Sequence, residues 1–459
     1  MLWGVDYRND FMKRHPFAVA RAFAVAAALA VLAGPVAGED LLQVYREAQK
    51  QDPSIASARS LWEATQERVP QARAALLPQV AALGQANANT YDATVNTSPR
   101  GSISQQYGQG NLTFSASQPL YRPQNVVALD QAREQVSQSD FTLGISQQDL
   151  ILRTTVAYFD VLLAEYNVEL AEQQKIAVSE QLAQAKRNFE VGTATITDTN
   201  EAQARYDAIV ASEIQARNDL ERRRSALAAI IGRAPRGLKR LGPGFEPPLP
   251  DPNNVDFWVA RATTENLQVR SSLSNYEIAS LEVDRARAGH LPTVDLVASA
   301  GAQASNGSAS LDFSSNSRTA LFGVVLNVPI YQGGFVTSRV REAISLQDRS
   351  RADLEAAKRL AIQNAQDGFY GINSAAAGVK ALGQAVASAE VALQSNILGQ
   401  EVGIRTNLDV LNVQQNVFQT RRDLANAYFQ YLIAVLRLKA AIGTLNERDV
   451  EDLNRRLSG

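Results

Sequence analysis

The chain carries the same order of motifs twice, and this duplication limits the folds open to it. The segment VGTATITDTNEAQ at Val191–Gln203 recurs as VGIRTNLDVLNVQ at Val402–Gln414. Three further landmarks recur in the same order: QARAALLPQV and RARAGHLPTV, QPLY and VPIY, and LAAIIG and LKAAIG. A unit of about 210 residues is too long for a short-repeat solenoid, so we predict that each copy builds one structural half.

Residues 1–38 have the features of a secretory signal peptide. Lys13 and Arg14 supply a positive start, and an Ala-rich apolar run from Phe17 to Ala33 ends in small residues near Gly38. Either Met1 or Met12 is compatible with this reading. The alternative is a membrane anchor, but the run is short and Ala-rich for a spanning helix.

Composition removes several classes of function. The chain has no cysteine, which excludes disulfides and thiolate metal sites. The cluster Arg222–Arg224 lacks interleaved aromatic residues, so we predict no nucleic-acid partner. His290 is the only histidine after the signal segment, and we interpret it as a packing residue. We find no motif for a catalytic site, a metal or a cofactor, and we predict none.

The distribution of proline outlines the helices, because proline interrupts them. None occurs between Pro123 and Pro235 or after Pro329, whereas six fall in RAPRGLKRLGPGFEPPLPDP. Each proline-free stretch begins with a long helical pattern, within which apolar residues recur at alternating steps of three and four, as in packed helices. Each predicted long helix has about 67 residues and would be about 100 Å long, at about 1.5 Å per residue.

These signals predict two repeats joined by a linker. The signal peptide covers 1–38. The first repeat, 39–232, contains a helix, the β-hairpin 79–119, the long helix 123–190 and the helix 196–231, and a Pro-rich equatorial linker follows at 233–256. The second repeat, 257–445, contains a helix, the β-hairpin 293–329, the long helix 334–401 and the helix 407–442, and a C-terminal equatorial segment ends the chain at 446–459.

The two hairpins show alternation of apolar and polar residues, as at Leu112, Phe114 and Ala116. We predict four strands of about 10–13 residues, joined by polar loops at Thr90–Gln106 and Ser305–Arg318; length and alternation fit transmembrane strands. The alternative is an ordinary half-buried hairpin in a soluble protein. Four strands cannot close a membrane barrel, whereas three chains would supply twelve strands around an aqueous lumen.

With these features the chain resembles the TolC family of outer-membrane channel proteins. The resemblance rests on the duplicated LP–strand–P-[LI]-Y–long-helix order, on VGTATITD and VGIRTNLDVLNVQQ, and on the ending RLKAAIGTLNERD. It implies a mixed α/β membrane protein that forms a homotrimer. A 12-stranded outer-membrane β-barrel, four strands per chain, would continue into a long periplasmic α-helical barrel with an equatorial belt from Gly232–Asp256 and Asn446–Gly459.

The resemblance also implies a function without enzymatic activity. The protein would be the outer-membrane exit duct of a tripartite efflux pump or a type I secretion system in a Gram-negative bacterium. Its partners would be a periplasmic adaptor (membrane fusion) protein, an inner-membrane ABC, RND or MFS pump, and outer-membrane lipid. The alternative is a periplasmic coiled-coil adaptor or scaffold without a pore, which would account for the helices but not for the four alternating strands.

The duplicated motif has a structural meaning of its own. Gly192 and Gly403 follow the long helices, where a left-handed cap is expected. Thr195 with Asp198, and Thr406 with Asp409, have the spacing of capping boxes at the start of the next helix. The motif therefore predicts two reversals of the chain at the tips of the molecule.

By resemblance, these tips form the periplasmic gate. Asp409 matches a constricting aspartate ring, for which like-charge repulsion predicts a raised pKa. Arg405, Thr197 and Asp198 match a polar network that holds the mouth shut. At the position where the family has a second aspartate ring, this chain has Asn412, and at the position of a tyrosine that joins the network it has Gln400. We therefore expect a mouth that is less negative and more easily opened. The residues expected to dock the adaptor are Val191, Gly192, Thr193, Val402, Gly403 and Ile404.

Overall fold

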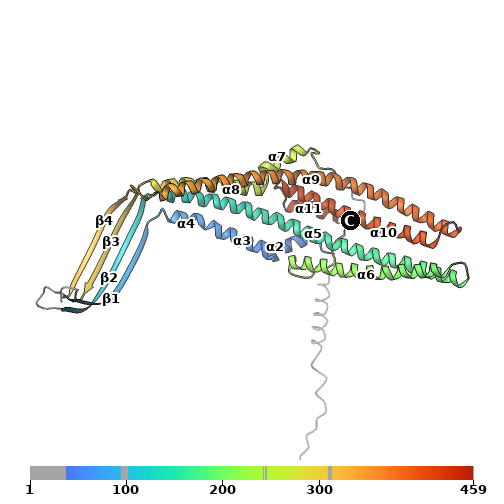
Figure 1. Ribbon diagram of the computed structural model, residues 1–459, viewed down its shortest axis with the longest axis horizontal. Helices are drawn as coiled ribbons and strands as arrows, with labels where there is room; N and C mark the ends of the chain where they lie inside the picture. The colour runs from blue at the N-terminus through green and yellow to red at the C-terminus, as the bar shows by residue number, and fades with distance from the viewer. Residues whose placement is uncertain (1–37, 95–101, 241, 243–245, 309–312, 458–459) are drawn as a thin grey trace, which may run out of the picture.

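The computed structural model describes residues 38–94, 102–240, 242, 246–308 and 313–457. The predicted signal peptide therefore lies outside the described residues, apart from Gly38. The molecule is long and narrow, with a four-stranded sheet at one end and two helical hairpin tips at the other (Figure 1). Among the described helices, not one has a continuous apolar stretch that would suffice to cross a bilayer.

Each half consists of short helices, a β-hairpin and two longer helices. The first half contains α2 (Leu41–Gln51), α3 (Pro53–Gln66), α4 (Arg68–Ala74), β1 (Gln79–Thr94), β2 (Ser102–Tyr121), α5 (Pro123–Glu190) and α6 (Ile196–Ile231). The second contains α7 (Val255–Glu265), α8 (Leu267–Arg287), the short 3-10 helix η1 (Ala288–His290), β3 (Thr293–Ser305), β4 (Ser315–Asn327), α9 (Phe335–Glu401), α10 (Asn407–Ala441) and α11 (Glu447–Leu457).

The long helices α5 and α9 run the length of the helical part, and the shorter helices lie along them. Toward the tips, α6 packs on α5 and α10 on α9. Toward the sheet, α3 and α4 lie on α5, while α8 lies between α5 and α9. Two shorter helices in succession thus match one long helix, which gives each half a continuous layer (Figure 1).

The sheet is antiparallel in the order β1-β2-β3-β4, and β1 and β2 are longer than predicted. They have 16 and 20 residues, and their register continues to Thr94↔Ser102. The predicted loop at Thr90–Gln106 is therefore wrong for most of its length, and Ser315–Arg318 belongs to β4 rather than to a loop. Polar residues suggested loops, but the ladder of backbone hydrogen bonds needs no apolar side chains.

One face of the sheet is predominantly apolar. Phe114 pairs with Ala82 and Ala300, and Ala298 pairs with Phe322, so these side chains share one face. Phe322 remains 77% exposed in the single chain. Burying such a face in a non-aqueous environment is favourable, at about 25 cal/mol per Å².

The main core lies at the middle of the molecule, where the linker, α2 and α11 meet the long helices. Tyr158 of α5 is fully buried and donates hydrogen bonds to the carbonyl oxygens of Glu39 (3.1 Å) and Lys239 (2.8 Å). Tyr431 of α10 likewise donates to the carbonyl oxygen of Pro248 at 2.6 Å. Two buried hydroxyls thus fasten the linker to the helices.

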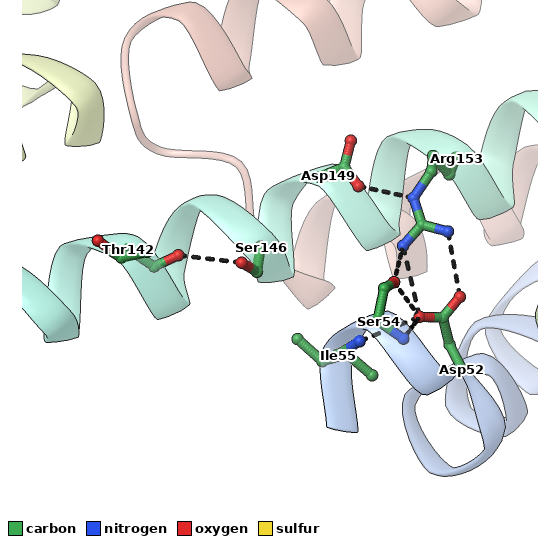
Figure 2. Close-up of polar contacts among 7 residues, drawn as sticks. All are labelled: Asp52, Ser54, Ile55, Thr142, Ser146, Asp149 and Arg153. Atoms are coloured by element: carbon green, nitrogen blue, oxygen red, sulfur yellow. Dashed lines mark hydrogen bonds and ion pairs between the residues drawn. The ribbon is translucent and has the colours of Figure 1, made fainter. Parts of the chain in front are cut away.

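An ion pair holds the α2–α3 junction against α5 (Figure 2). Asp52 is buried, caps α3 by accepting from the N–H groups of Ser54 (2.9 Å) and Ile55 (3.0 Å), and pairs with Arg153 at 3.1 Å. Arg153 also pairs with the exposed Asp149 at 2.6 Å. Burial opposes ionisation of Asp52, but the hydrogen bonds from Arg153, Ser54 and Ile55 outweigh it and hold its pKa at about 2.

We expect Asp52→Asn to lower the free energy of unfolding at pH 7 by about 1–2 kcal/mol, a value discounted because Arg153 is partly exposed. A carboxyl with a lowered folded pKa stabilises the fold above its unfolded pKa and loses this effect as the pH falls. The difference between wild type and variant should thus shrink between about pH 4 and pH 2. Denaturant unfolding followed by circular dichroism at several pH values measures it. Asp149→Asn, which alters an exposed partner of the same arginine, is the control; equal losses in both variants would contradict the prediction.

Candidate functional site

The two chain reversals at the helix tips have the same backbone geometry. Gly192 and Gly403 have φ of 80° and 79°, values that favour glycine. In the α5–α6 turn, two backbone N–H groups donate to the carbonyl oxygen of Asn188, and in the α9–α10 turn, two donate to that of Gly399. The duplicated sequence therefore forms a duplicated turn.

Both predicted capping boxes are confirmed. At the start of α6, the Asp198 carboxylate accepts from the Thr195 N–H at 2.8 Å, and the Thr195 hydroxyl accepts from the Asp198 N–H at 3.2 Å. At the start of α10, Asp409 and Thr406 exchange the same bonds at 2.9 and 3.1 Å. Each aspartate is thus oriented by its helix end.

Within one chain, the pKa of Asp409 is lowered. The backbone N–H of Thr406 is the main cause, followed by the Thr406 hydroxyl, and the charge of Arg405 adds to it. This is opposite to the raised pKa predicted for an aspartate ring, because the repulsion that would raise it requires carboxylates from other copies.

The other predicted gate residues are distributed over both turns. Thr197 and Asp198 begin α6, whereas Arg405 lies in the α9–α10 turn, exposed to solvent and packed over Gly399. Among the described residues, no hydrogen bond or ion pair joins Arg405 to Thr197 or Asp198. Gln400 donates a long hydrogen bond of 3.4 Å to Asn407 across the same turn.

A contact that the sequence did not reveal joins the two hairpins. Arg205 of α6 donates to the side-chain oxygens of Asn412 (2.8 Å) and Gln415 (2.6 Å) on α10. We call these three residues the tip tie. Arg205 lies seven residues after Asp198, so helical periodicity places both on one face of α6. Its partners, however, lie more than 200 residues away in sequence, and no pattern pointed to them.

Apolar packing accompanies the tip tie. Leu411 of α10 joins Val178, Leu182 and Ala185 of α5 and Ala202 and Ile209 of α6 in one buried cluster. The two hairpins are therefore in contact close to their tips, through apolar side chains and through three polar ones.

The residues predicted to dock an adaptor lie at the very ends of the hairpins. Val191 is 74% exposed, Val402 63% and Ile404 79%, and Gly192, Thr193 and Gly403 are also exposed. Apolar residues presented in this way at a protein end are typical of an interaction site.

Comparison with known sequences gives consistent matches over the chain. The sequence profile described as "Outer membrane efflux protein" matches residues 44–233 and 258–444. The outer membrane protein TolC of Vibrio cholerae is 34% identical over 92% of this chain and 95% of its own length. The alkaline protease secretion protein AprF of Pseudomonas aeruginosa is 31% identical over 90% of this chain and 86% of its own length.

Solved structures show the same fold at lower sequence identity. The outer membrane protein VceC of Vibrio cholerae has a TM-score of 0.74 at 19% identity, covering 88% of this chain and 96% of VceC. The CmeC outer membrane channel of Campylobacter jejuni has a TM-score of 0.75 at 15% identity, covering 92% of this chain and 89% of CmeC.

Proposed function

Because the chain belongs to the outer membrane efflux protein family, we propose that its two helix tips form the periplasmic gate of an outer-membrane exit duct. Members of this family are channels and not enzymes, and they reside in the outer membrane of Gram-negative bacteria. The chain accordingly serves as an outer-membrane exit duct in efflux and type I secretion. The scaffold without a pore, our alternative from the sequence, has no support in these relatives.

The duct requires more than one copy, and three copies fit the sheet. In the described sheet, β1 and β4 each pair on one side only, so both edges remain available for strands of neighbouring chains. Twelve strands from three chains would close one barrel, and the helical layers below would continue it. The predicted repeats 39–232 and 257–445 would then each contribute one hairpin of the helical tunnel.

The proposed partners follow from the exposed tips. An adaptor protein would bind Val191, Gly192 and Thr193 of one turn and Val402, Gly403 and Ile404 of the other, and would couple the duct to an inner-membrane ABC, RND or MFS pump. Two relatives have names that specify protease secretion: AprF of Pseudomonas aeruginosa and PrtF of Dickeya chrysanthemi. They support the secretion role. A relative named as an efflux protein, BepC of Brucella suis, supports the efflux role.

The observation that carries the gate assignment is the pair of matched turns, each with an aspartate fixed by a capping box. In the proposed trimer, Asp409 and Arg405 line the mouth, with Asn412 and Gln400 beside them, while Thr197 and Asp198 of the other turn pack around it. A ring of carboxylates attracts cations and repels anions. The wild-type channel should therefore conduct weakly and prefer cations.

We expect Asp409→Asn to reduce the cation-to-anion permeability ratio by about twofold or more, because it removes one charge per chain from the narrowest point. Reversal potentials of single channels in planar bilayers under a salt gradient measure this ratio. Asp198→Asn is the matched comparison, since it removes the same charge from the equivalent capping box beside the ring rather than in it, and it should lower the ratio less. Equal effects of the two substitutions would contradict the ring assignment, and a protein that is soluble without detergent and gives no conductance would contradict the duct.

A further inference from the structure

Charged side chains are rare in the sheet. Asp92, Asp295 and Arg318 are the only charged residues within the four strands as described. Asp295 is buried and forms an ion pair of 2.7 Å with Arg122. Asp92 and Arg318 are exposed, and in the described part of the chain neither side chain has an ion-pair partner. They have opposite charges and lie on β1 and β4, the two outer strands of the sheet (Figure 1).

Both side chains lie on the apolar face of the sheet. Arg318 is opposite Ala302 of β3. The same row of paired residues continues through Leu112 of β2 to Gly84 of β1. Paired residues point to the same face, and the face alternates along each strand. Asp92 lies eight residues further along β1 than Gly84, which is an even number, so Asp92 shares the face of Arg318.

The row that contains Arg318 climbs away from the helices as it crosses the sheet. Gly84 lies five residues from the helix-side end of β1 and ten from its outer end. Arg318 lies nine residues from the helix-side end of β4 and only three from its outer end. The row thus climbs by four to seven residues over the three steps from β1 to β4. Tilted strands that close into a barrel have a stagger of this kind.

The stagger determines which residues meet where β4 of one copy joins β1 of the next. That junction adds a fourth step, so the climb from Gly84 becomes about five to nine residues. The apolar faces of both copies point outward, so the offset is an even number, about six or eight. An offset of eight places Asp92 of the next copy directly opposite Arg318. An offset of six places Thr90 there, with Asp92 beside it on the same face.

We propose that the Arg318 guanidinium forms an ion pair with the Asp92 carboxylate of the neighbouring copy at every β4–β1 junction of the barrel. This inference rests on the trimer of the proposed function and specifies the register in which its copies join. An arginine side chain reaches a carboxylate directly opposite, with Cβ atoms about 5 Å apart, or on the diagonal, at about 7–8 Å. The pair neutralises both charges on the apolar face of the strands as described, and it favours one register over its neighbours.

The test exchanges the two charges in the full-length protein. Asp92→Arg and Arg318→Asp should each lower the fraction of trimer that survives heating in detergent by about fivefold, because like charges then meet at every junction. The double variant Asp92→Arg/Arg318→Asp should restore the trimer, since opposite charges face each other again. Native mass spectrometry measures the trimer fraction and the number of copies.

A matched control moves the carboxylate by one strand. Asp92→Ser combined with Ser104→Asp keeps the net charge, because Ser104 of β2 is the partner of Asp92 and shares its face. The carboxylate is then inside the sheet, away from the junction, so this variant should lose as much trimer as Asp92→Ser alone.

Cross-linking measures the register directly, because the chain has no cysteine of its own. Arg318→Cys should form disulfide-linked trimers when combined with Asp92→Cys or Thr90→Cys, but not with Gly84→Cys. Cross-linking through Gly84→Cys, or a charge exchange that does not restore the trimer, would overturn the ion pair while leaving the duct in place. A wild type without any trimer would overturn both the ion pair and the duct.

Discussion

Arg205→Ala should raise the open probability of the channel about tenfold. The substitution removes both hydrogen bonds of the tip tie, to Asn412 and Gln415, and these are the polar contacts that hold α6 against α10 near the mouth. Two hydrogen bonds from a charged group in a half-exposed setting are worth about 1–2 kcal/mol together. A change of 1.4 kcal/mol in an open–closed equilibrium is about tenfold. Single-channel recording in planar bilayers measures it.

The tip tie predicts a specific pattern among variants. Asn412→Ala and Gln415→Ala should each raise the open probability by part of the Arg205→Ala effect. Adding either substitution to Arg205→Ala should change the open probability little, because the hydrogen bond to that partner is already lost. Arg222→Ala serves as the control, because Arg222 is on the same helix and, within the described part of the chain, its ion-pair partner is Asp219 of that helix. If Arg205→Ala behaves like Arg222→Ala while Arg405→Ser opens the channel, the closed state depends on contacts between chains rather than on the tip tie.

Gly443→Ala should cost about 2–5 kcal/mol of stability. Gly443 follows α10 with φ of 76°, a backbone conformation that costs other residues about 1–2 kcal/mol. A Cβ at this position would lie 2.3 Å from the carbonyl oxygen of Glu265 and 3.1 Å from the Cα of Asn266. Because these are backbone atoms at the α7–α8 junction, the junction must move, which adds an overpacking cost of about 1–3 kcal/mol. Denaturant unfolding measures the total.

The duplication supplies the control for this prediction. Gly232 ends α6 as Gly443 ends α10, and its φ is 75°. A Cβ there would meet only the side chain of Gln51, at 3.4 Å, so Gly232→Ala should cost only about 1–2 kcal/mol. If the two substitutions were equally destabilising, the backbone conformation alone would account for the loss, and the close approach of α7–α8 to Gly443 would have no energetic role.

Local signals in the sequence were sufficient for the helix ends. The repeated turn motif contains its own determinants, since a glycine that adopts positive φ and a Thr–Asp capping box act within a few residues of each other. The same applies to the four strands, whose alternation of apolar and polar residues marks one face. At Thr90–Gln106, the polar side chains led us to predict a loop where the strands β1 and β2 continue. Side-chain composition was misleading there, because the hydrogen bonds between strands join backbone groups whatever the side chains are.

Two features depended on tertiary structure because their partners are distant in sequence. Asp52 by itself predicts only a helix cap, and the largest cause that lowers its pKa is the hydrogen bond from Arg153, about 100 residues away. Arg205 has the appearance of a solvated helix residue until α10 is placed beside α6. Periodicity and capping are properties of neighbouring residues and can be read along the chain. Ion pairs between helices depend on how the helices pack, and this is decided by the whole core at once.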